Sequence, residues 1–275
     1  MIQNKDLLAI IKKKGQFMSK RDLQIENIIS SLHSLTSMDS ILDFLKENHW
    51  IVEEYRKDHF SRLFHHSKED ESKKHIDLFI DCINAGGIGK LDDKSKSLEI
   101  FEEKYNSTYK NDPNFMINDL FENKYVQLKQ KKSGLFIECL YYNNLINNSI
   151  LDKNEKIVLP IDAVILRLLT YMLPKKHENT LKKNDDTIKK SLTKYAKGNL
   201  GNKYSDYVKF DDLWFWGHIT TQKNELTPKF NYTQVNLDPL LRYKKELLEE
   251  KAKTFIELIN KVKNESNQKI KIAKM

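Results

Sequence analysis

The chain has 275 residues and a formal net charge of +8, and its eight glycines and five prolines are few for this length. So few turn-forming residues argue against a protein built from many short strands. The sequence also contains no run of about 18 apolar residues, the length that a membrane-spanning helix needs. The two cysteines, Cys82 and Cys139, exclude a disulfide framework, a CxxC metal pair and a four-cysteine iron–sulfur cluster. With 31% charged residues and apolar residues at helical spacing, the composition favours an all-α protein.

Amphipathic helices are predicted along the first half of the chain. Apolar residues recur at helical spacing in the segments 4–14, 21–35, 37–64, 72–84, 94–107 and 112–132. Ser37 is a plausible cap, and Pro113 follows Asp112 as a start signal. Residues 135–147 come next and are apolar on almost every side, which is typical of a helix buried in the middle of a protein.

Three more helices are predicted in the second half. Apolar residues at helical spacing run from Ile161 to Met172 and stop before Pro174, a second buried segment covers residues 210–219, and a long apolar stripe covers 238–264. We expect the last helix to pack back on the first ones, and little regular structure in the segments 67–73, 175–186 and the last ten residues. The sequence thus predicts an N-terminal helical lobe (1–110), a central lobe (111–200) and C-terminal helices (201–275).

Basic residues gather in one part of the chain. Residues 175–203 hold nine lysines against three acidic residues, an excess that could contact the phosphates of a nucleic acid. A solvated lysine-rich segment is an equal alternative. The first residues, "MIQNKDLLAIIKKKG", lack a long apolar core and a small-residue cleavage site, so the protein is expected to be cytoplasmic.

Several motifs fail as chemical sites. The stretch "GGIGK", residues 86–90, lacks the Ser or Thr and the preceding strand of a phosphate loop, so an ordinary turn after a helix is the better interpretation. The eight histidines form no HExxH pattern, and no metal site is predicted.

Asp162 is the acidic residue that carries a chemical hypothesis. It follows Pro160 closely and opens the apolar helix 161–172, so its carboxylate can accept hydrogen bonds from the first free backbone amides. The positive end of the helix dipole favours its ionised form. A carboxylate of this kind is an ordinary N-cap, and it is equally suited to stabilise a cationic sugar or to handle a proton.

The residues around Asp162 resemble a known family. In "KKSGLFIECLYYNNLINNSILDKNEKIVLPIDAVILRLL", Lys132 precedes Ser133 and an apolar helix, and an aspartate follows 30 positions later in "LPID". This pattern resembles the helix-hairpin-helix DNA glycosylase superfamily, and most of all the archaeal-type 8-oxoguanine DNA glycosylases. Further along, "DDLWFWG" offers Asp212 followed four residues later by Trp216, a second motif of that family.

The resemblance implies a fold and a reaction. The fold would be an all-α, two-lobed helical bundle with a cleft between the lobes, and the protein would be a monomer associated with the nucleoid. The reaction would be removal of an oxidised purine, 8-oxoguanine first of all, from double-stranded DNA, with abasic-site lyase activity. No metal or organic cofactor would be needed.

The resemblance also assigns roles to individual residues. Lys132 would attack the sugar as a free amine, since a helix N-terminus and partial burial disfavour its cationic form, and Asp162 would stabilise the developing positive charge. Base binding is expected from Asp212, Trp216 and Trp214, although plain core packing explains the aromatic residues equally well. Contacts with the DNA backbone are expected from Lys131, Ser133, Gly134, Arg167, Lys182 and Lys183.

Two alternatives to this function stay open. The same fold could excise another modified base in phage defence or restriction, or the protein could be a non-catalytic helical nucleic-acid-binding protein that uses the lysine-rich segment.

Overall fold

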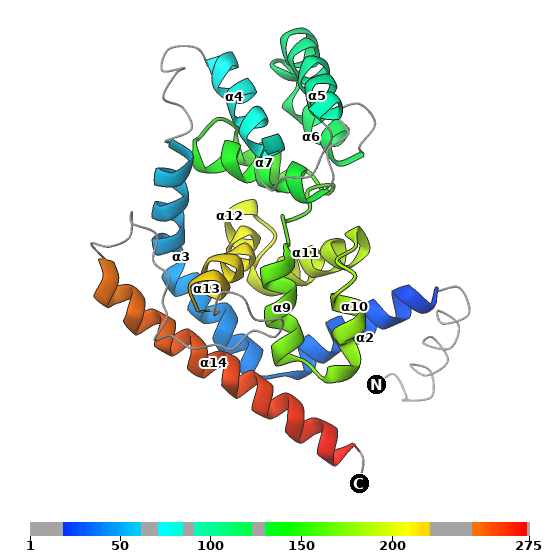
Figure 1. Cartoon of the computed structure of the whole chain (residues 1–275), viewed down its shortest axis with the longest axis vertical. Helices are drawn as coiled ribbons and strands as arrows, with labels where there is room; N and C mark the ends of the chain where they lie inside the picture. The colour runs from blue at the N-terminus through cyan, green and yellow to red at the C-terminus, as the bar shows by residue number, and fades with distance from the viewer. Residues whose placement is uncertain (1–18, 62–70, 85–90, 123–129, 221–243, 274–275) are drawn as a thin grey trace.

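The computed structural model describes residues 19–61, 71–84, 91–122, 130–220 and 244–273, and these form helices and connecting segments without a strand (Figure 1). The prediction of an all-α protein is therefore confirmed, whereas the helix predicted at residues 4–14 lies outside the described residues. The helices are α2 (Lys20–Ser34), α3 (Ser37–Ser61), α4 (Glu71–Asn84), α5 (Leu91–Lys104), η2 (Tyr105–Tyr109), α6 (Pro113–Glu122), α7 (Gln130–Tyr142), α8 (Asn148–Lys153), α9 (Ala163–Met172), η3 (Lys175–His177), α10 (Glu178–Leu181), α11 (Asp186–Leu200), α12 (Tyr204–Tyr207), η4 (Val208–Asp211), α13 (Asp212–Thr220) and α14 (Lys245–Ile272).

One group of helices forms around α7. Helices α4, α5 and α6 lie beside it at one end of the molecule (Figure 1). Their shared core is aromatic: Phe79 and Phe101 stack with ring centroids 3.8 Å apart, and Phe136 of α7 meets both rings edge-on. Edge-to-face contacts of this kind add stability beyond area burial alone.

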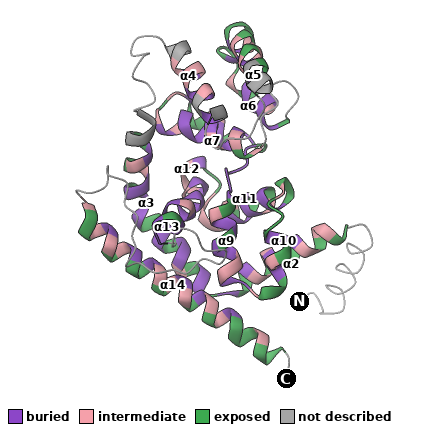
Figure 2. Cartoon of the chain, in the orientation of Figure 1, coloured by how far each residue is buried: buried purple, intermediate pink, exposed green. Residues whose placement is uncertain are grey.

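The larger group forms around α3 and α14. Helix α14 runs along α3, so the last helix of the chain covers one of the first (Figure 1). Phe44 of α3 and Phe255 of α14 enclose Trp216 of α13, whose side chain is fully buried. Figure 2 shows buried residues on the inward faces of these helices and exposed ones on the outward face of α14.

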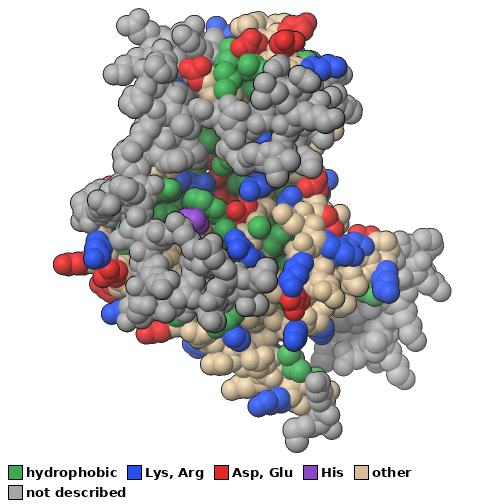
Figure 3. All heavy atoms as spheres, in the orientation of Figure 1, with side chains coloured by type: hydrophobic (Ala, Val, Ile, Leu, Met, Phe, Trp, Pro, Cys, Tyr) green, Lys and Arg blue, Asp and Glu red, His purple; other side chains and the backbone are tan. Residues whose placement is uncertain are grey.

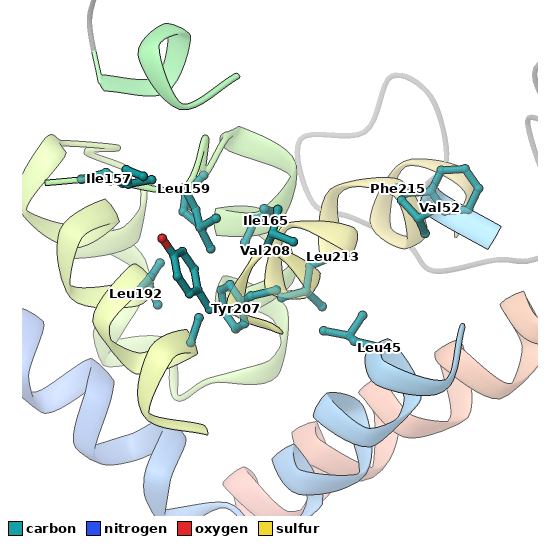
Figure 4. Close-up of a cluster of buried hydrophobic side chains, with 14 of the residues drawn as sticks. Leu45, Val52, Ile157, Leu159, Ile165, Leu192, Tyr207, Val208, Leu213 and Phe215 are labelled. Carbon is teal, nitrogen blue, oxygen red and sulfur yellow. The ribbon is translucent and has the colours of Figure 1, made fainter. Parts of the chain in front are cut away.

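A second cluster of apolar side chains joins α3 to the middle of the chain. In Figure 4, Leu45 and Val52 of α3, Leu159 and Ile165 near the start of α9, Leu192 of α11 and the residues Tyr207, Val208 and Leu213 gather in one core. Segments far apart in the sequence therefore meet here, around the short stretch that leads into α9.

In that stretch, residues 155 and 156 form an exposed turn, and residues 157–162, the extended segment, are buried. The backbone N–H of Leu159 donates to Oγ1 of Thr193 in α11 at 3.0 Å. On its other side, α7 passes so close that a Cβ added at Gly134 would lie 2.5 Å from the carbonyl oxygen of Val158. Glycine at position 134 thus allows α7 to contact the segment that positions Asp162.

Some details differ from the predictions. Residues 175–181, expected to have little regular structure, form η3 and α10, because His177, Thr180 and Leu181 are buried and anchor them. The boundary expected at residue 110 falls between η2 and α6, which pack against each other. Within the described residues, no helix has the length and apolar character needed to cross a membrane.

Candidate active site

Asp162 lies where the extended segment ends and α9 begins. Its Oδ1 accepts hydrogen bonds from the backbone N–H groups of Val164 at 2.7 Å and Ile165 at 3.2 Å, which makes it the N-cap that its sequence context predicts. The residue is buried except for a small part of its side chain, which is 13% exposed. One carboxylate oxygen is therefore used for capping, while the other is directed elsewhere.

Lys131 of α7 approaches that second oxygen. Its Nζ lies 3.8 Å from Oδ2 of Asp162, and 46% of the lysine side chain is exposed. This distance is too long for a hydrogen bond, so the two groups form a loose ion pair at the surface. The family resemblance places Lys131 on the DNA backbone, and an alignment shifted by one residue would make it the amine instead; the structure brings it to the carboxylate.

Lys132, the amine implied by the family resemblance, is the next residue and is half-buried. Both lysines belong to the first turn of α7, because this helix begins at Gln130 rather than at residue 135.

Ser133 and Gly134 do not lie where the resemblance predicts. Ser133 is fully buried and donates its hydroxyl to the carbonyl of Leu120 at 2.8 Å, and Gly134 packs against Val158. Neither residue offers a surface for a DNA phosphate in this structure, because both are needed to seat α7 against its neighbours.

The base-binding residues predicted in "DDLWFWG" are also mostly internal. Trp216 is 0% exposed between Phe44 and Phe255, so it offers no free ring face, contrary to the prediction. Trp214 is half-buried and stacks on His218 with an interplanar angle of 9°. The alternative interpretation of Trp216 as a core residue holds.

Asp212 is fully buried at the start of α13. Its Oδ2 lies 2.7 Å from Nδ1 of His49 in α3, and its Oδ1 has no hydrogen-bond partner among the described residues. Burial raises the pKa of Asp212, although the hydrogen bond from His49 opposes the shift.

A buried charge cluster that the sequence analysis did not identify surrounds Asp212. Arg56 of α3 donates to Oε2 of Glu138 in α7 at 2.6 Å and also to Oδ2 of Asp211 in η4. Three buried carboxylates here face one guanidinium and the ring of His49, so burial disfavours the ionisation of all three together. Burial raises the pKa of Glu138 and raises that of Asp211 to about 6, against the opposing effect of Arg56.

The sequence contains one signal for this cluster. Glu138 is the single charged residue in the apolar stretch "GLFIECLYY", and a charge at such a position requires a partner when the helix is buried. Nothing in the sequence identifies Arg56 as that partner, because it lies 82 positions earlier.

The remaining predicted backbone contacts lie on the surface. Arg167 is exposed on α9, with its Nε donating to the carbonyl of Ala163, and Lys182 and Lys183 are exposed after α10, where Lys182 pairs with Glu178. Figure 3 shows Lys and Arg side chains spread over the part of this face where α9, α10 and α11 lie.

Comparison with protein-family models, curated proteins and solved structures finds no match to this chain, so the family resemblance depends on the motifs alone. Within the described residues, no group of three or more His, Cys, Asp or Glu side chains could hold a metal ion. The site thus consists of an amine from Lys131, the carboxylate of Asp162 and the N-termini of α7 and α9.

Proposed function

We propose that the protein is a DNA glycosylase with abasic-site lyase activity, and that it acts on an oxidised purine such as 8-oxoguanine. The observation that supports this function is the approach of the exposed Lys131 to the largely buried Asp162, with Nζ and Oδ2 3.8 Å apart at the adjoining N-termini of α7 and α9. Glycosylases that work through a Schiff base need an amine and a carboxylate beside the same sugar.

The reaction follows from the roles of these two groups. The neutral amine attacks C1′ of an extruded nucleotide, the bond from C1′ to the base breaks, and the departing base nitrogen takes up a proton. Asp162 stabilises the positive charge that develops on the sugar. Opening of the sugar ring gives an iminium linkage, and loss of a proton from C2′ then expels the 3′ phosphate.

The 3.8 Å distance favours Lys131 as the nucleophile, while the resemblance implies Lys132. Borohydride reduces the iminium and traps the enzyme covalently on DNA, so trapping on an 8-oxoguanine duplex distinguishes the two. We expect Lys131→Ala to abolish trapping and Lys132→Ala to retain it. Lys261→Ala, at an exposed position of α14, is the matched control and should trap like the wild type.

Other outcomes have clear meanings. Loss of trapping in Lys132→Ala alone would assign the chemistry to Lys132 instead. A wild-type protein that binds duplex DNA but traps none of a panel of damaged duplexes would disprove the glycosylase, and the non-catalytic DNA-binding alternative would replace it.

A further inference from the structure

A groove of about 830 Å³ lies between α11 and the segment that leads to Asp162. One wall is formed by Lys190, Lys194 and Lys197 of α11, and the floor includes Ile157 and Val158 of the extended segment. Gln130 also lines the groove, and Lys131 is the next residue along α7. The groove is therefore lined by the residue before Lys131 on α7, whereas Lys131 and Asp162 do not themselves line it.

The three lysines form one face of α11. At 1.5 Å per residue, positions 190, 194 and 197 span about 10 Å along the helix. A DNA strand carries one phosphate per about 3.4 Å of helix axis, so this length corresponds to about three phosphates. The lysine row is thus long enough to reach several phosphates of one DNA strand.

The groove lysines differ in their partners from Lys182 and Lys189, two other lysines of the basic segment. Lys182 and Lys189 form ion pairs with Glu178 and Asp186, whereas neither Lys190 nor Lys194 forms one with another described residue. The ammonium of Lys197 lies 4.6 Å from the ring centroid of Tyr207. Burial lowers the pKa of Lys197, and the nearby carboxylate of Glu155 partly opposes this shift. A bound anion would act in the same direction as Glu155 and favour the charged form of Lys197.

Acidic residues on the opposite wall are mostly engaged within the protein. Asp152 accepts a hydrogen bond from the backbone N–H of Tyr204 at 2.7 Å, and Glu122 pairs with Lys156. Glu155 is the exposed carboxylate that faces the lysine wall without such a bond among the described residues.

We infer that this groove binds the phosphate backbone of the DNA strand next to the extruded nucleotide, with Lys190, Lys194 and Lys197 as the phosphate contacts. The inference rests on the proposed function for its choice of DNA, and it moves the main backbone contact from Lys182 and Lys183 to α11.

Salt-dependent binding tests the groove separately from catalysis. The affinity for an undamaged fluorescent duplex would be measured by anisotropy between about 50 and 200 mM salt. For the triple variant Lys190→Gln, Lys194→Gln, Lys197→Gln we expect the slope of log affinity against log salt to fall by about 0.9 per lost contact, up to about 2.7. The control variant Lys253→Gln, Lys261→Gln, Lys271→Gln removes the same charge from α14 and should change the slope by less than about 1.

A variant of the opposite wall gives the reverse effect. Glu155→Gln removes the facing negative charge, so we expect it to bind the duplex more tightly than the wild type. Circular dichroism melting of every variant verifies that the fold is retained.

Equal slope changes in both triple variants would mean that net charge alone sets the salt dependence of binding, and would overturn the assignment of the groove as the DNA-backbone site. Tighter binding of an RNA duplex of the same sequence would overturn the choice of DNA. If the wild type traps damaged DNA while the groove variant keeps the wild-type salt slope, the groove is not the DNA-backbone site, and the glycosylase proposal is retained. If the salt slope of the groove variant falls while the wild type traps nothing, the groove is retained as the DNA-backbone site, and the glycosylase proposal is rejected.

Discussion

At the scale of single residues, Gly134 shows how one side chain, or its absence, determines where the candidate amine lies. At Gly134, α7 packs directly against the backbone of residues 158–160. A Cβ at this position would meet backbone atoms that have no room to move. Because Lys131 and Lys132 lie three and two residues before Gly134 on the same helix, any displacement of α7 would also displace them from Asp162.

A pair of glycine substitutions tests this contact. Gly134→Ala places a methyl group 2.5 Å from the carbonyl oxygen of Val158, so we expect a loss of about 1–3 kcal/mol in the free energy of unfolding. Gly198→Ala, also in a helix, meets nothing within 4 Å and should stabilise the protein by about 1 kcal/mol through helix propensity. Urea denaturation measures both, and equal effects of the two changes would contradict the close approach at position 134.

At the scale of helices, the carboxylate of Asp162 has two roles, one for each of its oxygens. It caps α9 through Oδ1 and faces Lys131 with Oδ2, so a loss of activity after mutation has to be separated from a loss of the cap.

Two substitutions of Asp162 make that separation. Asp162→Asn keeps an oxygen for capping but loses the charge, so its stability should stay within about 0.5 kcal/mol of the wild type while base excision falls about 10²–10⁴-fold. Asp162→Ala should lose the same activity and also about 1 kcal/mol of stability. Thermal melting and a single-turnover excision assay measure the two effects, and full activity of Asp162→Asn would remove the carboxylate from the mechanism.

At the scale of the whole molecule, the last helix, α14, is joined to the start of α3 by hydrogen bonds. Glu265 of α14 accepts hydrogen bonds from the backbone N–H groups of Thr36 at 3.0 Å and Ser37 at 2.9 Å, where α3 begins. Ser37, predicted as the cap of α3, is instead its first residue, and the capping acceptor comes from 228 positions away.

This clasp has a predictable pH dependence. Burial alone would raise the pKa of Glu265, but the hydrogen bonds from Ser37 and Thr36 and the ammonium of Lys269 outweigh it and lower the pKa to about 2. A carboxylate with a lowered pKa stabilises the fold above its ordinary value of 4.5, and this stability is lost as the pH falls towards 2. We therefore expect Glu265→Gln to lower the melting temperature at pH 7, with a difference from the wild type that shrinks as the pH falls from about 4.5 to 2. A difference that stays constant over this range would contradict the role of the charge.

Patterns in the sequence predict the helical class, the approximate places of the apolar helices and the cap at Asp162, whereas α7 begins five residues earlier than predicted and α14 continues to Ile272. These features are local: apolar spacing specifies a helix face, and an aspartate ahead of an apolar helix accepts its free amides.

Only the tertiary structure decided which side chains meet. It brought Lys131 to Asp162, buried Trp216, Ser133 and Gly134, paired Arg56 with Glu138 and Asp211, and placed Lys190, Lys194 and Lys197 of α11 along one groove. The physical reason is that these contacts depend on how α3, α7, α9 and α11 pack against one another, and a pattern of residue types along one helix carries no information about the position of another.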